Sequence, residues 1–296
     1  MKLKPLGNTG WQVSELSFGC MSLKSSALPE CEKLIKHAVD AGINFFDTAD
    51  LYEKGGNEKL VGQALKPVRK DIFLATKAGN QWRADGSGWD WNPRRDYILS
   101  CAEESLKRLQ TDYIDLYQLH GGTIEDNIDE TIEAFELLKQ QGKIRHYGIS
   151  SIRPNVIREY VERSSIESVM VQYSLLDRRP EEMVLPLLDR HDKGILVRGA
   201  LAQGLLINKP AKEYLGYGEA AVQRLQEAIG EFAGQYTPQQ LAVQYVLRNP
   251  AITSVVAGIR TGGQLEELLM ALKPVENAVL KQLSGCLEPL LYTQHR

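Results

Sequence analysis

The chain has 296 residues, of which 43% are hydrophobic and 25% are charged, and its formal net charge is −3. These values are typical of a globular protein with enough chain to bury a large core, and they do not indicate disorder. Because there is no excess of basic residues, composition gives no reason to expect nucleic acid or an anionic membrane as a partner, so we expect a small molecule.

Cysteine usage and the N-terminal residues predict a cytoplasmic protein. The four cysteines, at positions 20, 31, 101 and 286, form no Cys-x-x-Cys pair and are too sparse for a disulfide framework. The segment Met1–Pro5 lacks the apolar core of a signal peptide, and no run of about 18 apolar residues is present to span a bilayer. We therefore expect reduced thiols and no membrane association.

Strand-like and helix-like patterns alternate along the chain after a predicted N-terminal β-hairpin that turns at Gly7–Gly10. Short apolar runs predict eight strands. The predicted strands are Glu15–Phe18, Asn44–Thr48, Ile72–Lys77, Tyr113–Leu119, His146–Ser150, Ser168–Gln172, Gly194–Arg198 and Ser254–Ala257.

Amphipathic segments with apolar residues at helical spacing lie between and after these runs. The predicted helices are Cys31–Ala41, Asn57–Leu65, Asp96–Leu109, Glu130–Gln141, Val156–Glu162, Glu181–Arg190, Gln239–Leu247 and Gln264–Ala271. An unbroken series of eight strand–helix units indicates an α/β fold, a single (β/α)8 TIM barrel that forms one domain over residues 1–296.

Three segments stand outside the regular units. The predicted loops Asn80–Pro93 and Ala202–Gly218 follow the third and seventh strands, on the side of a barrel where active sites lie, and their length is typical of lids or specificity loops. The tail Pro274–Arg296 holds an extra C-terminal helix near Val275–Leu287, which caps the barrel or completes the substrate pocket.

Four polar residues coincide with the ends of consecutive predicted strands. Asp47, Lys77 and His120 each close an apolar run, and Tyr52 follows Asp47 by five residues. If the strands are parallel neighbours, these side chains meet. A lysine beside a tyrosine lowers the pKa of the phenol, an aspartate keeps the lysine charged, and a neutral histidine can orient a carbonyl oxygen. The set predicts proton transfer to a carbonyl group.

Other familiar sites are excluded by motif. The chain has no Gly-x-Gly-x-x-Gly after a strand, no phosphate-binding Gly-x-x-x-x-Gly-Lys-Ser/Thr, and no His-x-His or His-Glu-x-x-His. We therefore expect neither a Rossmann site nor a P-loop, and no metal.

The sequence resembles the aldo-keto reductase superfamily over essentially its whole length. Four motifs carry the resemblance, in the family's order: Gly42–Ala49 around Asp47, Thr76–Lys77, Asp112–Leu116 before His120, and Gly142–Ser150. In that family Asp, Tyr, Lys and His at these positions form a catalytic tetrad. The resemblance implies that NADP(H) supplies a hydride, so that Tyr52, Asp47, Lys77 and His120 are expected to be catalytic residues of carbonyl reduction.

The resemblance also implies where the cofactor binds, across the barrel mouth. Residues after the first strand are expected at the nicotinamide ribose, and Ser150, Ser151 and Gln172 at the carboxamide, although Ser151 replaces the commoner Asn. Asp47 is also expected to contact the cofactor. Arg198 stands where relatives often place an aromatic residue that stacks on the nicotinamide. The remaining expected cofactor residues are Gly19, Cys20, Met21, Gly199, Leu201, Gln203, Gly204, Leu205, Gly258, Arg260, Thr261, Gln264 and Glu267.

Arg260 is expected to pair with the adenosine 2′-phosphate, which favours NADPH over NADH. Leu268 stands where many relatives have an adenine-binding Asn. For the small-molecule carbonyl substrate we expect Tyr52 and His120, with an apolar wall formed by Trp82, Trp89 and Trp91.

Two alternative functions remain open at this point. The barrel resembles the potassium-channel β subunits too, which makes it a candidate nicotinamide-binding regulatory subunit with little turnover. Alternatively, Lys77 at a strand end forms a Schiff base in an aldolase-like lyase.

Overall fold

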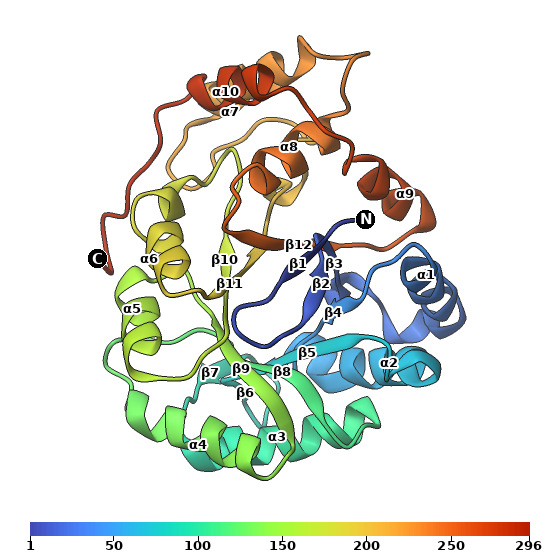
Figure 1. Cartoon of the computed structure of the whole chain (residues 1–296), viewed down its shortest axis with the longest axis vertical. Helices are drawn as coiled ribbons and strands as arrows, with labels where there is room; N and C mark the ends of the chain where they lie inside the picture. The colour runs from blue at the N-terminus through green and yellow to red at the C-terminus, as the bar shows by residue number, and fades with distance from the viewer.

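Eight parallel strands close into a barrel at the centre of the molecule (Figure 1). The computed structural model describes residues 1–296, with the side chain of Ser25 excepted. Each strand pairs with the next along the chain, and the last pairs with the first. All eight predicted strands are confirmed: β3 (Leu16–Gly19), β4 (Phe45–Asp47), β5 (Phe73–Ala78), β8 (Ile114–Leu119), β9 (Ile144–Ser150), β10 (Ser168–Gln172), β11 (Gly194–Arg198) and β12 (Ile252–Gly258).

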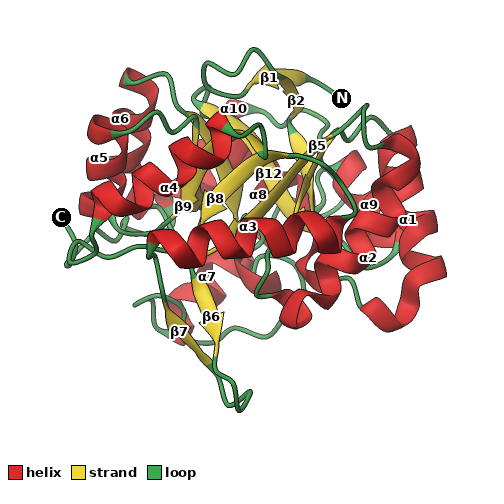
Figure 2. Cartoon of the chain, turned by 90° about the horizontal axis from the view of Figure 1, so that it is seen from below, coloured by secondary structure: helices red, strands yellow, loops and turns green.

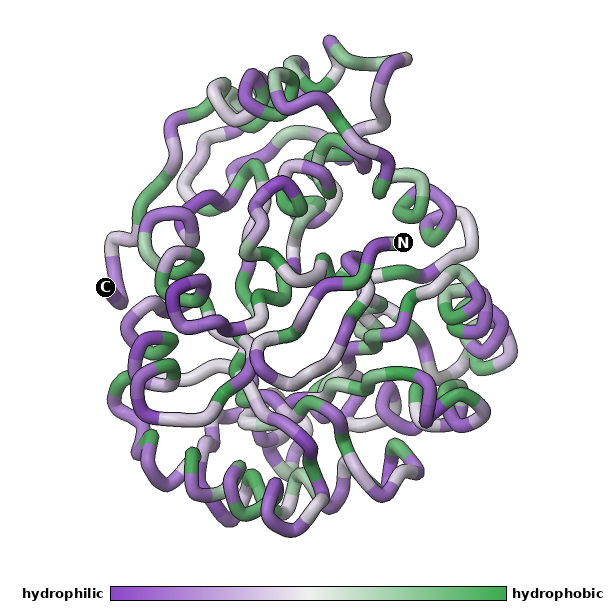
Figure 3. Tube along the Cα trace, viewed as in Figure 1, coloured by the Kyte–Doolittle hydropathy of each residue, from purple (hydrophilic) through white to green (hydrophobic). Residues whose placement is uncertain are grey.

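The predicted helices surround the barrel and turn their apolar sides toward it (Figures 1 and 3). Side-chain oxygens of Asn127, Thr237 and Thr261 accept backbone hydrogen bonds at the starts of three of them, α4, α8 and α9, as N-cap residues do. The bounds are α1 (Leu28–Asp40), α2 (Gly56–Leu65), α3 (Arg95–Leu109), α4 (Ile128–Gln140), α5 (Pro154–Arg163), α6 (Val184–Arg190), α8 (Pro238–Leu247) and α9 (Gly262–Met270).

The N-terminal hairpin covers one end of the barrel. Strands β1 (Leu3–Pro5) and β2 (Gln12–Ser14) pair antiparallel, as predicted. Buried Leu6 and Val13 cluster with Phe45 and other inward residues of the barrel strands. The functional side chains must therefore lie at the opposite end, where the strands finish.

That opposite end carries a second hairpin. The segment Asn80–Pro93 was expected to be irregular, but β6 (Asn80–Trp82) and β7 (Trp89–Trp91) pair antiparallel and project from the barrel (Figure 2). Its turn contains Asp85-Gly86, a common hairpin signal. The prediction of an irregular loop is wrong because each strand has only three residues and neither forms an apolar run. Strand β6 reads Asn-Gln-Trp, and β7 reads Trp-Asp-Trp.

Two further helices lie outside the eight units. The C-terminal helix α10 (Asn277–Gly285) is confirmed, whereas α7 (Glu219–Gly230), which follows the loop after β11, was not predicted. One three-residue 3-10 turn, η6 (Ala202–Gly204), interrupts that loop. Among the helices of the described residues, none combines the length and the apolar character needed to cross a membrane.

Candidate active site

The four residues singled out at strand ends line one cavity of about 880 Å³. Asp47 is the last residue of β4, Lys77 lies near the end of β5, and His120 directly follows β8. Tyr52 opens the turn η3 (Tyr52–Gly55), which leads from β4 to α2. Because neighbouring parallel strands end at the same edge, the backbone alone brings these positions together, as predicted.

Asp47 and Lys77 form a buried ion pair. Lys77 Nζ lies 2.5 Å from Asp47 Oδ1 and donates a second hydrogen bond, of 2.8 Å, to the carbonyl oxygen of Thr48. Gln118 Nε2 donates to the other carboxylate oxygen at 3.1 Å. Burial opposes the charge on Lys77, but Asp47 and Tyr52 together raise its pKa above the ordinary lysine value. Lys77 is therefore a fixed cation at neutral pH.

Tyr52 packs between this cation and the histidine. Lys77 Nζ lies 5.3 Å from the centroid of the Tyr52 ring, and the His120 ring meets it edge-on at 6.0 Å between centroids. Burial raises the pKa of Tyr52 above the ordinary tyrosine value, and Lys77 only opposes that rise. The expected net lowering of this pKa is wrong, because the desolvation of the phenolate outweighs the attraction of the ammonium.

His120 is neutral in this setting. Burial, with the nearby charges of Lys77 and Arg198, lowers its pKa to about 3. Its Nδ1 is buried and has no hydrogen-bond partner among the described residues, while Asn80 Nδ2 donates to its backbone oxygen at 3.0 Å. A neutral imidazole whose ring faces the cavity can donate one hydrogen bond to a substrate oxygen.

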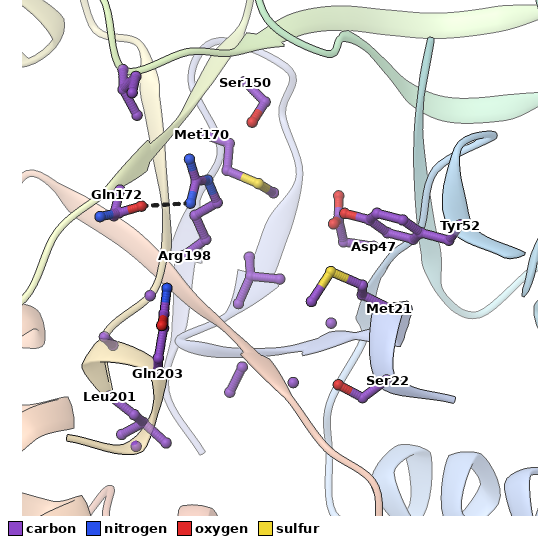
Figure 4. Close-up of a pocket in the computed structure, with 18 of the residues that line it drawn as sticks. Met21, Ser22, Asp47, Tyr52, Ser150, Met170, Gln172, Arg198, Leu201 and Gln203 are labelled. Atoms are coloured by element: carbon purple, nitrogen blue, oxygen red, sulfur yellow. Dashed lines mark hydrogen bonds between the residues drawn. The ribbon is translucent and has the colours of Figure 1, made fainter. Parts of the chain in front are cut away.

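Most of the expected cofactor residues line the same cavity. Figure 4 shows Arg198 and Gln172 on the side opposite Tyr52 and Asp47, with Met170 between the two pairs and Met21 beside Tyr52 and Asp47. Arg198 Nη1 donates to Gln172 Oε1 at 2.7 Å. The other expected residues on the cavity wall are Gly19, Ser150, Ser151, Gly199, Leu201, Gln203, Gly204, Gly258, Arg260, Gln264 and Glu267.

The structure does not bring six expected residues to the wall. Cys20 and Leu205 are buried in the core, and burial raises the pKa of the Cys20 thiol. Thr261 accepts from the backbone N–H of Gln264 at the start of α9. The three tryptophans belong to the β6–β7 hairpin: Trp82 hydrogen-bonds the backbone of Leu51, Trp91 hydrogen-bonds Asp126, and Trp89 is 48% exposed.

Several wall residues were missed by the sequence reasoning. Some follow predicted strands directly and had a positional signal: Gly121 and Gly122 after β8, Ile152 and Arg153 after β9, and Leu51 between Asp47 and Tyr52. The other missed wall residues lie on strands, helices or loops whose position at the cavity follows only from the three-dimensional fold. These are Ser22, Met170, Ala200, Ile207, Asn208, Lys209, Tyr214, Gln239, Val256 and Ala257, whereas Leu268, at the position of the family's adenine-binding Asn, had been singled out.

Charge on the wall is unevenly balanced. Asp47 neutralises Lys77, and Glu267 adds a second carboxylate, but Arg153, Arg198, Lys209 and Arg260 appear in none of the ion pairs formed by described residues. The backbone N–H of Arg260 donates to Gln264 Oε1 at 3.0 Å, directly before the N-terminus of α9. The cavity therefore suits an anionic ligand that is larger than a simple carbonyl compound.

A barrel with this tetrad of side chains at its strand ends defines a known class of oxidoreductase, and the comparison with protein families agrees. The model of the aldo/keto reductase family matches residues 15–288, and the chain belongs to that family.

Among known proteins, the chain is 47% identical to the uncharacterized oxidoreductase YqkF of Bacillus subtilis (strain 168), over 100% of both chains. It is 30% identical to the NADH-specific methylglyoxal reductase of Escherichia coli (strain K12), over 92% of this chain and 94% of that one. The holo form of aldo-keto reductase AKR11C1 from Bacillus halodurans superposes with a TM-score of 0.94 at 46% identity, covering 100% of this chain and 99% of the other. The (β/α)8 architecture and the family are thus confirmed.

Proposed function

We propose that the protein reduces an aldehyde or ketone with NADPH and that Tyr52 protonates the product oxygen. The observation that carries the proposal is the convergence of Asp47, Tyr52, Lys77 and His120 on one cavity at the C-terminal ends of β4, β5 and β8. Family membership gives oxidoreductase chemistry, and the arrangement of these four side chains supports a proton donor beside a group that orients a carbonyl.

The wall fits a nicotinamide dinucleotide. The unpaired cations Arg198, Lys209 and Arg260 match its phosphates, and the capped start of α9 offers backbone N–H groups beside Arg260. Gly19 also lines the cavity, and a Cβ there would lie 3.1 Å from the carbonyl oxygen of Ala257, so the packing of β3 against β12 favours glycine at this position. When bound, the cofactor supplies the hydride. A relative is named for NADH specificity, so the preference for NADPH rests on Arg260 alone.

The chain's own residues would move the proton. The raised pKa of Tyr52 keeps its hydroxyl protonated at neutral pH, which is the form that a proton donor needs. Lys77, held by Asp47, stabilises the phenolate that forms when the proton leaves. His120, being neutral, donates an N–H to the carbonyl oxygen and orients it toward Tyr52. Apolar Met21 and Leu51 on the same wall favour a substrate with an apolar body.

The lyase alternative is disfavoured by the state of Lys77. A Schiff base requires a neutral amine, whereas the pKa of Lys77 is raised and its ammonium donates to Asp47 and Thr48. The regulatory-subunit alternative predicts cofactor binding without turnover, so a turnover assay separates it from the reductase.

The test measures oxidation of NADPH and of NADH at 340 nm with a small aldehyde panel that includes 4-nitrobenzaldehyde and methylglyoxal. We expect turnover by the wild type and a fall in kcat of about 10²–10⁴-fold in Tyr52→Phe, with an unchanged Kd for NADPH, because only the proton step is removed. Equal turnover in Tyr52→Phe would falsify the assignment. Binding of NADPH without turnover by the wild type would favour the regulatory subunit.

A further inference from the structure

The turn that carries Tyr52 has an unusual backbone. Directly after Tyr52, Glu53 and Lys54 adopt φ angles of 49° and 54°, and Gly55 follows at 84°. Left-handed conformations are unfavourable for residues with a Cβ, and two such residues in succession persist only where the surroundings hold them. The position of Tyr52 therefore depends on contacts that its turn makes outside the tetrad.

Trp82 supplies such contacts on both sides of Tyr52. Its indole Nε1 donates a 3.3 Å hydrogen bond to the carbonyl oxygen of Leu51, the residue before Tyr52. Its ring faces Lys54, two residues after Tyr52, with Lys54 Nζ 4.9 Å from the ring centroid. One side chain of the β6–β7 hairpin thus holds both ends of the short segment 51–54, although Trp82 itself is not on the cavity wall.

The hairpin is well placed to act as a support. Trp91, on the partner strand β7, donates to both carboxylate oxygens of Asp126, at 2.9 and 3.0 Å, and packs against the core. At the hairpin turn, a Cβ on Gly86 would lie 2.8 Å from Lys54 Nζ, so the turn closes over this lysine. Trp91 fixes the hairpin to the barrel, and Trp82 connects the hairpin to the turn.

We propose that Trp82 is a positioning residue for Tyr52 and that the β6–β7 hairpin fixes the backbone of the catalytic turn, rather than forming the expected substrate wall. The contacts divide into two groups. Lys77 and His120 orient the ring of Tyr52, whereas Trp82 and Lys54 fix the backbone from which that ring extends. As a claim about catalysis, this inference rests on the proposed role of Tyr52 as proton donor.

The test compares kcat, KM and the Kd for NADPH in four variants. Trp82→Phe removes the N–H donor and keeps a ring, Lys54→Met removes the cation and keeps the aliphatic chain, and Lys54→Arg keeps the cation. Trp11→Phe is the matched control, because Trp11 stacks on Phe73 beneath the barrel, far from the turn. We expect kcat to fall about tenfold in Trp82→Phe and Lys54→Met, with KM and Kd within twofold, and wild-type kcat in Lys54→Arg and Trp11→Phe.

A double variant and a spectroscopic probe complete the design. If both residues act through one contact, Trp82→Phe with Lys54→Met lowers kcat no further than the single changes do. With 3-fluorotyrosine at position 52 alone, the fluorine NMR signal is expected to broaden or shift in both variants and to stay unchanged in Trp11→Phe.

The outcomes separate this inference from the proposed function. Wild-type kcat and an unmoved fluorine signal in Lys54→Met, an exposed change that leaves the core intact, would overturn the role of the hairpin even if Trp82→Phe failed to fold. An increase in KM alone would assign Trp82 to substrate binding instead, and would also overturn it. If Tyr52→Phe retains full activity, the proposed function fails, yet the fluorine signal still reports whether the hairpin holds the turn.

Discussion

Lys77 has three N–H donors, and each has a defined direction. One goes to Asp47, one to the carbonyl oxygen of Thr48, and the third faces the hydroxyl of Tyr52. Because the lysine side chain is only 1% exposed, water does not compete for these donors. The ammonium therefore cannot turn away from the phenol, and a phenolate at position 52 would find its counter-charge already in place.

The pKa of His120 predicts the shape of the pH profile. Since this pKa lies near 3, the imidazole stays neutral from pH 5 upward and contributes no ionisation between pH 5 and 9. Tyr52 must be protonated to act as an acid, so its raised pKa places the loss of activity on the alkaline side, above the ordinary tyrosine value near 10. We expect kcat/KM for reduction to be flat from pH 6 to 9, measured by NADPH oxidation in overlapping buffers.

His120→Asn is the control for this profile. The amide keeps a hydrogen-bond donor but has no ionisation near neutral pH, so the variant should be slower with a curve of the same shape. An inflection between pH 6 and 8 in the wild type that disappears in His120→Asn would show that the histidine titrates during turnover, against this prediction.

The convergence of the four residues on one cavity could be predicted because each polar side chain ends or follows an apolar run, and strand ends converge in a barrel. Cys20 and Leu205 were placed at the cofactor because their segments resemble those of the family, but adjacent side chains point in different directions, and these two enter the core. The direction of the pKa shift of Tyr52 could not be predicted from the sequence either, because desolvation depends on which residues cover the ring in the fold.

At the scale of elements, the start of α9 concentrates the expected phosphate contacts. Thr261 caps the helix, Gln264 accepts from the backbone N–H of Arg260, and Gln239 on α8 donates to Glu267 at 2.9 Å. These contacts fix the backbone, and the guanidinium of Arg260 forms no ion pair with any residue whose side chain the structure describes, so it can reach a ligand. The fixed helix end and the free cation together favour a phosphate dianion at this place.

Arg260→Gln tests this arrangement. Removing the guanidinium takes away the charge that pairs with a 2′-phosphate, so we expect KM for NADPH to rise about tenfold or more and KM for NADH to stay nearly constant. Steady-state rates with each cofactor at a saturating aldehyde concentration measure the effect. Arg190→Gln on the outer helix α6, whose Nε donates to the carbonyl of Pro186, is the matched control.

A parallel rise in KM for both cofactors would contradict the assignment, because it would place Arg260 at a group that NADPH and NADH share. An unchanged ratio of the two KM values would likewise move NADPH selectivity to another residue, with Lys209 the next cation on the wall.

The barrel strands could be predicted from the sequence because parallel strands covered on both faces read as continuous apolar runs. The elements that were missed lie in the inserts. In α7, Val222, Leu225 and Ile229 have helical spacing and are buried, so the signal was present but belongs to no strand–helix unit. In β6 and β7 the strands are too short for periodicity, and only Asp85-Gly86 indicates the turn.

On the scale of the whole molecule, the C-terminal tail connects helices and loops around the barrel that are far apart in the sequence. The backbone oxygen of His295 accepts from Asn155 on α5, and Arg296 pairs with Glu182 before α6. Tyr217, after β11, contacts the tail at Glu288 and Leu290. The described residues that line the cavity all precede Pro274. The tail therefore supports the cavity wall from outside, and the expectation that it completes the substrate pocket is wrong.

One hydroxyl group connects the tail to the cavity, which makes Tyr217→Phe a test of that support. Tyr217 Oη donates to the carbonyl oxygen of Glu288 at 2.7 Å and accepts from the N–H of Leu290 at 3.3 Å. Its backbone exchanges two hydrogen bonds of 2.9 Å with Tyr214, which lines the cavity. Phe leaves both tail groups without this partner, so we expect a loss of about 1–2 kcal/mol in the free energy of unfolding, measured in urea.

The same change should also weaken ligand binding, because a less rigid 214–217 turn would no longer hold Tyr214 in place on the cavity wall. We expect the Kd for NADPH, measured by fluorescence titration, to rise about threefold in Tyr217→Phe, while kcat stays near the wild-type value because the tetrad is untouched. Tyr113→Phe is the matched control, since Tyr113 meets Arg69 and Arg145 through its ring face, which Phe retains. A drop in stability with an unchanged Kd would mean that the tail stabilises the barrel without shaping the cavity, and the link from tail to wall would then be wrong.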